Sequence, residues 1–342
     1  MIPARKSRDL QILVVFTGGT ISSRVSGGTF AISDPPYQLL DHVSSDDIHF
    51  TVCEPFRILS ENMTPDMLFH LFCAISDECS SKIYDGILIA HGTDTMAYTA
   101  QLAHILLSGL GIPSILIGSK LPLQNPDSDG TVHFANAIAL FRQVSSGVYV
   151  ISRSDNGIIY VHSAGKIMQA AMGTDDFQSY KDQYAGIMED GRFQIASTNQ
   201  PDDIPSASLP YLRRLADLRT LPCPETVLVL DSCVGMNFQT LDLTRSEYKY
   251  ILQRAYHSGT ACTAPLPSPY SLLYLQTLCK ENFKSLFLAP VDRERIPYST
   301  AQELIHAGVT PVYDLPFEAV WAGLLVCTWL KEKPEEFVGS PG

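Results

Sequence analysis

Two apolar runs in the first hundred residues each end abruptly in a turn rich in glycine and threonine. Residues 12–16 (Ile-Leu-Val-Val-Phe) lead into Thr-Gly-Gly-Thr-Ile at 17–21, and residues 86–90 (Gly-Ile-Leu-Ile-Ala) lead into His-Gly-Thr-Asp-Thr at 91–95. A short apolar run without polar alternation is typical of a strand buried on both faces, as in a parallel sheet. Open α/β sheets bind ligands at the carboxyl ends of such strands. The two turns are therefore predicted to bring two hydroxyls and a carboxylate into one crevice.

Strand-type and helix-type segments alternate through the first half of the chain. Thr64, Pro65 and Asp66 supply an N-cap, a first-turn proline and a favourable charge for one of the helices. This alternation predicts an α/β fold with a doubly wound, mostly parallel sheet. The expected strands lie at 10–16, within 51–58, and at 86–90, 113–118 and 147–151, and the expected helices at 36–42, from 64 onward, and at 95–107 and 131–142.

Proline, serine, aspartate and asparagine accumulate around 198–224, which is typical of a connection between domains. A shorter α/β series follows, with expected strands at 226–230 and 285–289 and expected helices at 244–254, 270–279, 300–306 and 316–330. We therefore expect a larger N-terminal domain at 9–203 that carries the threonine turns and a linker at 204–224. A smaller C-terminal α/β domain of the flavodoxin-like type is expected at 225–331, followed by a tail at 332–342.

Composition narrows the class of protein. With 45% hydrophobic and 18% charged residues the chain can bury a sizeable core. A formal net charge of −12 argues against nucleic acid and anionic membranes as partners. No apolar run approaches the ~20 residues of a membrane span, and the basic N-terminus lacks the small-residue cleavage site of a signal peptide. Eight scattered cysteines without a Cys-x-x-Cys pattern indicate free thiols, and a cytoplasmic protein is expected.

The turn residues themselves leave alternatives open. The hydroxyl of a threonine is a weak nucleophile unless a base takes its proton, and the glycines at 18–19 can equally serve only to turn the chain, with a threonine capping the next helix. A phosphate cradle is a weaker reading, because neither Gly-x-x-x-x-Gly-Lys-Ser/Thr nor Gly-x-Gly-x-x-Gly follows the strand. Asp94 can hold a ligand ammonium or cap a helix. His91 is expected to be a packed turn residue rather than a base.

The two turns and their surroundings resemble the signature motifs of the bacterial-type L-asparaginase/glutaminase family, and the cytoplasmic branch more than the periplasmic one. The similarity extends from about residue 10 to residue 330 and is most specific in the first 140. The segments that carry it are Thr-Gly-Gly-Thr-Ile (17–21), Leu-Ser-Glu-Asn-Met-Thr-Pro (59–65), the stretch 85–100 around His-Gly-Thr-Asp-Thr, Gly-Ser-Lys-Leu-Pro-Leu (118–123), Ser-Asp-Gly (128–130) with Asn136, and weaker matches at 307–311, 313–314 and 318–319.

The resemblance implies a role for each matching position. Thr20 corresponds to the primary nucleophile, which forms an acyl-enzyme and releases ammonia, and Thr93 to the second catalytic threonine. Asp94 corresponds to the group that binds the α-ammonium of the substrate, and Ser60 to the group that holds its α-carboxylate. Glu61 falls where the family often has Gln or Asp near the amino group. Backbone N–H groups around Gly19–Thr20 and Gly92–Thr93 are expected to stabilise the oxyanion.

Three positions depart from the family pattern. The lid tyrosine of the family falls at Phe30, which has no hydroxyl, and Tyr37 lies farther along the chain. The catalytic lysine that the family carries upstream of Phe-x-Ser (177–179) is missing at the expected spacing, and Lys166 is the nearest candidate. The C-terminal turn of the family, which reaches a neighbouring site, is replaced at 256–261. Either His257 or Ser258 contacts the substrate across a subunit interface, or the turn has changed by drift and has no role in the site.

The resemblance therefore predicts an amidohydrolase that acts on L-asparagine or a related small amide, without metal or nucleotide cofactor. It implies a homodimer or homotetramer whose small-molecule amino-acid substrate binds between neighbouring subunits. Two alternatives remain open: a weak or inactive homologue that binds an amino acid without turnover, and a glutaminase-type subunit that supplies ammonia to a partner.

Overall fold

The computed structural model describes residues 9–26, 29–32, 36–42, 45–174, 176–196, 208–220, 226–244 and 247–339. The chain divides into two compact units, Met1–Thr220 and Leu221–Gly342. Both units are built on a sheet with helices against it, so the predicted α/β class with a larger and a smaller part is confirmed.

The first unit contains an eight-stranded sheet in the order β12-β11-β8-β7-β6-β5-β1-β4. The five strands from β4 to β7 run parallel to one another, and β8, β11 and β12 extend the sheet by antiparallel pairing, which the sequence did not reveal. The strands are β1 Leu10–Phe16, β4 Ile48–Cys53, β5 Gly86–Ala90, β6 Pro113–Ile117, β7 Gly147–Arg153, β8 Ile159–Ser163, β11 Gly186–Glu189 and β12 Arg192–Ile195.

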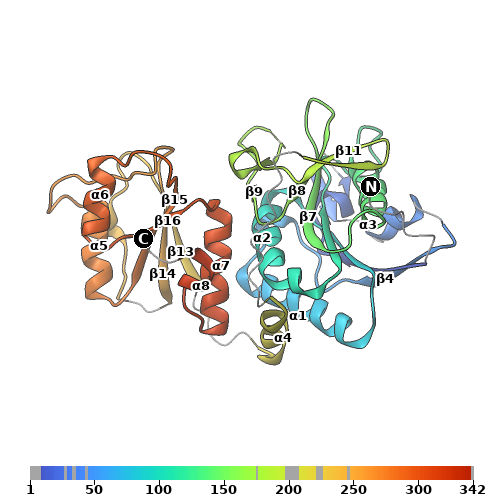
Figure 1. The fold of residues 1–342 in the computed structure, drawn as a ribbon, viewed down its shortest axis with the longest axis horizontal. Helices are drawn as coiled ribbons and strands as arrows, with labels where there is room; N and C mark the ends of the chain where they lie inside the picture. Colours follow the sequence, from blue (N-terminus) through green and yellow to red (C-terminus); the bar gives the residue numbers. More distant parts are fainter. Residues whose placement is uncertain are drawn as a thin grey trace. The chain divides into compact units, whose positions relative to one another are not determined.

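Helices cover both faces of this sheet (Figure 1). The side chains of Ile12, Val14 and Phe16 belong to the same buried cluster as those of Phe134 and Phe141 on α3. Because side chains alternate along a strand, the intervening buried residues of β1 face the other side, where α1, α2 and α4 pack against one another. These helices are α1 Pro65–Ser81, α2 Met96–Leu107, α3 Gly130–Phe141 and α4 Ser208–Asp217.

Short elements connect these strands and helices. The 3-10 turns that follow strands are η1 Thr20–Ser22, η3 Ser60–Asn62 and η4 Thr93–Thr95. The helix expected at 36–42 is present as the 3-10 helix η2 Pro36–His42. Two small antiparallel pairs, β2 with β3 and β9 with β10, stand outside the main sheet. The remaining bounds are β2 Ser23–Ser26, β3 Thr29–Ile32, η5 Ser108–Leu110, β9 Ile167–Met168, β10 Gln178–Ser179 and η6 Tyr180–Asp182.

The first unit extends into the stretch that the sequence suggested as a linker. Helix α4 lies within residues 204–224 and packs against α1 and α2. Its residues Tyr211, Leu212 and Leu215 are buried. The apolar residues of this helix recur at helical spacing, so that they form one buried face within a polar sequence.

The second unit contains a four-stranded sheet, β13-β14-β15-β16, in which every pairing is parallel. Helix α7 is buried along almost its whole length and contacts three of these strands. The elements are β13 Thr226–Asp231, η7 Phe238–Thr240, β14 Tyr248–Arg254, α5 Leu272–Glu281, β15 Ser285–Val291, α6 Ser299–His306, β16 Thr310–Tyr313, α7 Phe317–Leu330 and α8 Glu335–Val338.

The expected helix at 244–254 is wrong. Residues Tyr248–Arg254 form β14, which lies between β13 and β15. Tyr250, Ile251 and Leu252 are all buried, because a central parallel strand is covered on both faces. Such a strand shows a continuous apolar run instead of alternation, and periodicity alone does not separate it from a buried helix. Strand β16 was also not predicted, because it is only four residues long.

Within the ranges given above, no helix has both the length and the apolar character needed to cross a membrane. The histidine, cysteine, aspartate and glutamate side chains of the same residues form no group of three or more suited to hold a metal ion.

Candidate active site

The two threonine turns lie directly against each other. Phe16 of β1 pairs with Ala90 of β5, so the turns that follow leave the sheet side by side. Gly19 has a φ of +74°, and a Cβ atom built on it lies only 2.5 Å from Cα and N of Gly92. The backbones can touch at this point because both residues are glycines. The predicted juxtaposition of the two turns is therefore present in the fold.

The two threonines begin the short helical turns at this edge of the sheet. Thr20 is the first residue of η1 and is partly exposed, whereas the following Ile21 is buried in the core. Thr93 is likewise the partly exposed first residue of η4, and Asp94 after it is exposed. Both hydroxyl-bearing residues thus stand at the carboxyl ends of adjacent parallel strands, with a carboxylate beside them.

Ser60 reaches the same place from the other side of β1. The chain after β4 runs beside the first turn, where Gly19 N–H donates to Ile58 O at 2.8 Å and Ile58 N–H donates to Thr17 O at 3.0 Å. Ser60 is 4% exposed, and its side chain fills the space that a Cβ on Gly92 would need. Glu61 follows it on the exposed side of η3.

The hydroxyl of Ser60 donates to Asp94 Oδ2 at 3.2 Å. Thr95 Oγ1 donates to the carbonyl of Ser60 at 2.9 Å, and the amide of Gln169 donates to the carbonyl of Asp94. These contacts fix Ser60 and Asp94 relative to each other. The two residues predicted to bind the amino and carboxylate ends of a substrate therefore form one polar pair.

His91 is a structural residue of the second turn, as the sequence suggested. It is fully buried, Nδ1 lies 2.7 Å from the carbonyl of Gly92, and Nε2 lies 3.0 Å from Oγ1 of Thr99. With Nδ1–H donating to the carbonyl, Nε2 accepts from the hydroxyl of Thr99. Burial lowers the pKa of His91 from 6.5 to about 4. Both ring nitrogens hold the turn, so neither faces a substrate.

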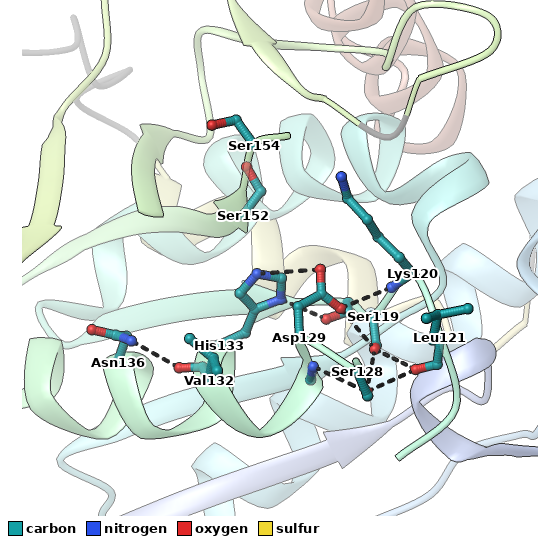
Figure 2. Close-up of polar contacts among 12 residues, drawn as sticks. Ser119, Lys120, Leu121, Ser128, Asp129, Val132, His133, Asn136, Ser152 and Ser154 are labelled. Atoms are coloured by element: carbon teal, nitrogen blue, oxygen red, sulfur yellow. Dashed lines mark hydrogen bonds and ion pairs between the residues drawn. The ribbon is translucent and has the colours of Figure 1, made fainter. Parts of the chain in front are cut away.

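A second group of polar side chains lines a small cavity beside Thr93. Its walls come from the loop after β6, the first turn of α3 and the end of β7, and they include Lys120, Asp129 and His133. Figure 2 shows these residues converging above α3. Gly118 separates them from the second turn, since a Cβ on Gly118 would lie 3.1 Å from Cγ2 of Thr93.

Lys120 connects three loops at this cavity. Its backbone N–H donates to Asp129 Oδ1 at 3.0 Å, and its ammonium lies 2.8 Å from Asp155 Oδ1 and 3.5 Å from Asp176 Oδ1. Lys166 lies in the turn between β8 and β9, and it does not line the cavity. The lysine that the structure places in the same cavity as Thr93 is thus Lys120, to which the sequence motifs assigned no role.

The remaining predicted positions lie elsewhere. Phe30 lies on β3 and Tyr37 on η2, but their side chains fall outside the described residues. His257 and Ser258 belong to the second unit, in a turn closed by a hydrogen bond from Tyr256 N–H to Thr260 O at 2.8 Å. Ser258 Oγ lies 2.9 Å from Thr260 Oγ1. Their role toward a neighbouring subunit stays a prediction.

Comparison with known proteins places this architecture in a family. The family model "Asparaginase, N-terminal" matches residues 11–201. The thermostable L-asparaginase from Thermococcus kodakarensis superposes with a TM-score of 0.71 at 20% identity and covers 97% of this chain and 100% of its own. A probable cytoplasmic L-asparaginase from Campylobacter jejuni gives a TM-score of 0.69 at 21% identity and covers 96% of each chain.

Among curated proteins, the chain matches one of the subunits of glutamyl-tRNA(Gln) amidotransferase from several archaea. The protein from Thermoplasma volcanium is 33% identical over 158 residues, which are 42% of this chain and 38% of the relative. The protein from Pyrococcus abyssi is 24% identical over 330 residues, 92% of this chain and 71% of the relative. The first of these matches thus spans well under half of the relative's length. Because the family model alone covers more than half of the residues of this chain, the chain belongs to the asparaginase family.

Proposed function

We propose that this protein is an amidohydrolase that hydrolyses L-asparagine or a related small amide to the acid and ammonia, with Thr20 as the nucleophile. The observation that carries the proposal is the contact of Gly19 with Gly92, which sets the Thr20 and Thr93 turns side by side. Ser60 and Asp94 lie at the same contact and are hydrogen-bonded to each other. Two hydroxyls, a carboxylate and backbone amides in one place are the groups that acyl transfer needs.

In the proposed reaction, the oxygen of Thr20 attacks the side-chain amide carbon, and ammonia leaves from the tetrahedral intermediate. The resulting ester is hydrolysed by water, with Thr93 as the second hydroxyl. Gly19 N–H already donates to Ile58 O at 2.8 Å, so it is committed to the backbone. The N–H groups of Thr20, Gly92 and Thr93 remain as the candidates that stabilise the oxyanion.

The substrate end of the site suits an α-amino acid. Asp94 is exposed and carries the only charge of the Ser60–Asp94 pair. We therefore assign Asp94 the role of binding the α-ammonium of the substrate. Ser60, buried below it, can turn its hydroxyl from Asp94 to a carboxylate oxygen. A charged hydrogen bond of this kind contributes about 1.5–3 kcal/mol, which is enough to orient a small substrate. We infer that the reaction takes place in the cytoplasm in a homo-oligomer.

Ammonia release from asparagine, glutamine and small amide analogues tests the proposal. Thr20→Ala and Thr93→Ala should each lower the rate by orders of magnitude, because members of one catalytic unit are not replaceable singly. Thr277→Ala, on the exposed face of α5 in the second unit, is the matched control and should keep the wild-type rate. Equal rates for wild type and Thr20→Ala would overturn the assignment of the nucleophile.

A second candidate function is that of a subunit that supplies ammonia to a partner enzyme. The names of the curated relatives, which are subunits of an amidotransferase, favour it. Co-purification with a second chain that stimulates hydrolysis would support this function over a stand-alone enzyme. Calorimetric binding of aspartate without any hydrolysis, alone or with a partner, would instead identify an amino-acid-binding homologue.

A further inference from the structure

His133 is a buried histidine with one ring nitrogen that has no hydrogen-bond partner among the described residues. It lies on α3 and is 3% exposed. Its Nδ1 lies 2.8 Å from the carbonyl of Gly118, and a carbonyl only accepts, so Nδ1 carries the proton. Nε2 therefore presents a lone pair, and within the described part of the chain nothing hydrogen-bonds to it. A buried polar atom without a partner requires an explanation.

The neighbour of this lone pair is a carboxylate. Asp129 receives the backbone N–H of Lys120 at 3.0 Å on Oδ1, and Ser119 Oγ lies 2.9 Å from the same oxygen. Its other oxygen, Oδ2, lies 3.7 Å from His133 Nε2 (Figure 2). With neutral His133, two acceptors thus face each other with no proton between them. A molecule that donates two hydrogen bonds would satisfy both.

The cavity that these residues line has the size for such a molecule. Its volume is about 10 Å³, and roughly 10–15 Å³ holds one water. Thr93 forms part of the same wall. A water here can donate to His133 Nε2 and Asp129 Oδ2 while it accepts from a hydroxyl. The cavity thus lies between Thr93 and an acceptor in the protein interior.

We propose that His133 is a positioning residue that takes up, through this single water, the proton that Thr93 gives away during hydrolysis. The proposal rests on the proposed function and deepens it, because it names the group behind the second threonine. The family pattern leads one to expect a lysine in this role. Lys120 is present in the cavity, but two aspartates bind its ammonium, whereas His133 is neutral and presents a lone pair.

The proton movements balance within the site. As the attacking water forms its bond to the acyl carbon, its proton passes to Thr93, the proton of Thr93 passes to the cavity water, and a proton of that water passes to His133 Nε2. When the bond between the acyl carbon and Thr20 breaks, the same chain returns the proton to the oxygen of Thr20. The net reaction consumes one water and yields the free acid and the free threonine.

The charges around His133 determine its pH range. Burial lowers the pKa of His133 below 6.5, and Asp129, at the start of the same helix, opposes this shift. Lys120, from the loop after β6, and Arg153, at the end of β7, add to the lowering. The imidazole is therefore neutral at pH 7 and accepts a proton, and Asp129 is placed to stabilise the imidazolium. Hydrolysis should decline as the pH falls through the pKa of His133.

The test is the pH profile of kcat for wild type, His133→Gln and Asp129→Asn with the best amide substrate. We expect His133→Gln to lower kcat about 10²-fold, to leave KM within twofold, and to lose the acid limb that wild type shows. Asp129→Asn should move that limb to lower pH, because the carboxylate no longer supports the protonated ring. His104→Gln, a partly buried histidine of α2 outside the cavity, is the control and should keep the wild-type profile.

A second measurement does not depend on how well the variants fold. The ¹⁵N signals of the His133 ring in wild type should show a protonated Nδ1 and an unprotonated Nε2 at pH 7. The reverse tautomer overturns the proposal. So does a His133→Gln enzyme whose acid limb equals that of wild type, even if its rate or stability is lower, because such a result assigns the residue a structural role. If wild type releases no ammonia from any amide, the proposed function fails as well.

Discussion

The contact between Gly19 and Gly92 gives the sharpest prediction, which is the effect of Gly19→Ala. Gly19 has a φ of +74°, where an L-residue with a Cβ costs roughly 1–2 kcal/mol. The new Cβ would also lie 2.5 Å from Cα and N of Gly92. Carbon atoms pack best at about 3.5–4.0 Å, so the two turns must separate by about 1 Å.

This separation should affect both stability and catalysis. Part of the clash can relax by moving the turns, and we expect a loss of about 2–4 kcal/mol in the free energy of unfolding, within the range of overpacking and backbone strain. A displacement of about 1 Å between reacting groups can cost about 10²-fold in rate. The value of kcat/KM for ammonia release should therefore fall at least about 100-fold in the Gly19→Ala enzyme.

Gly111→Ala is the matched control. Gly111 has nearly the same φ, +72°, but no atom lies within 4 Å of a Cβ built there. It should show the backbone cost of about 1–2 kcal/mol in urea unfolding and no change in kcat/KM. If Gly19→Ala and Gly111→Ala lose the same stability and both keep the wild-type kcat/KM, the contact between the turns does not organise the site and the reasoning is refuted.

Two further predictions concern charge. Burial lowers the pKa of His91 from 6.5 to about 4, so between these pH values only the unfolded chain binds the proton, and the free energy of unfolding falls by up to about 3 kcal/mol as the pH drops. Chemical unfolding at pH 7 and pH 4.5 should therefore show a smaller difference in the free energy of unfolding for His91→Gln than for wild type. An equal difference for the two proteins contradicts the lowered pKa. In the second unit, Glu318 is 2% exposed and its carboxylate lies 3.8 Å from the guanidinium of Arg254. Arg254→Met should destabilise this unit by about 3 kcal/mol, because it leaves a buried carboxylate without this cation. Arg254→Lys keeps a cation and should cost less, and urea unfolding measures both effects. A more stable Arg254→Met chain would contradict the argument.

Much of the fold was predictable, because the apolar runs, glycine turns and helix N-cap in the sequence indicate the same elements that are buried in the structure. Apart from the exposed Gln11, the strands β1 and β5 are apolar and end in glycine turns, so their parallel pairing and the edge at which they open follow from the pattern. The N-cap of α1 was equally clear, and Thr64 Oγ1 accepts from Met67 N–H at 3.4 Å. The antiparallel strands β8, β11 and β12 were missed, since they are short and their burial alternates only weakly.

The candidate site was predictable where it lies within motifs that directly follow strands. The family resemblance assigned Ser60 and Asp94 to the two ends of one substrate, and the structure joins them by a hydrogen bond. The cavity behind Thr93 was not predictable, because it depends on how the loop after β6 folds onto α3. A signal was nevertheless present: Asp129 and His133 are four residues apart, which places them on one face of a helix. Sequence alone does not show that this face meets Thr93.

The position of β1 between β4 and β5 has a consequence for the biogenesis of the protein. Leu10 pairs with Ile48 and Ile12 with Gly86, so the strand that precedes Thr20 finds both neighbours only in segments that are synthesised later. At about 5–20 residues per second, a ribosome exposes this apolar strand for seconds before its second partner emerges. Until then the segment is an unpaired template for other chains. Chaperones that hold extended apolar segments would thus have an early target directly beside the proposed nucleophile.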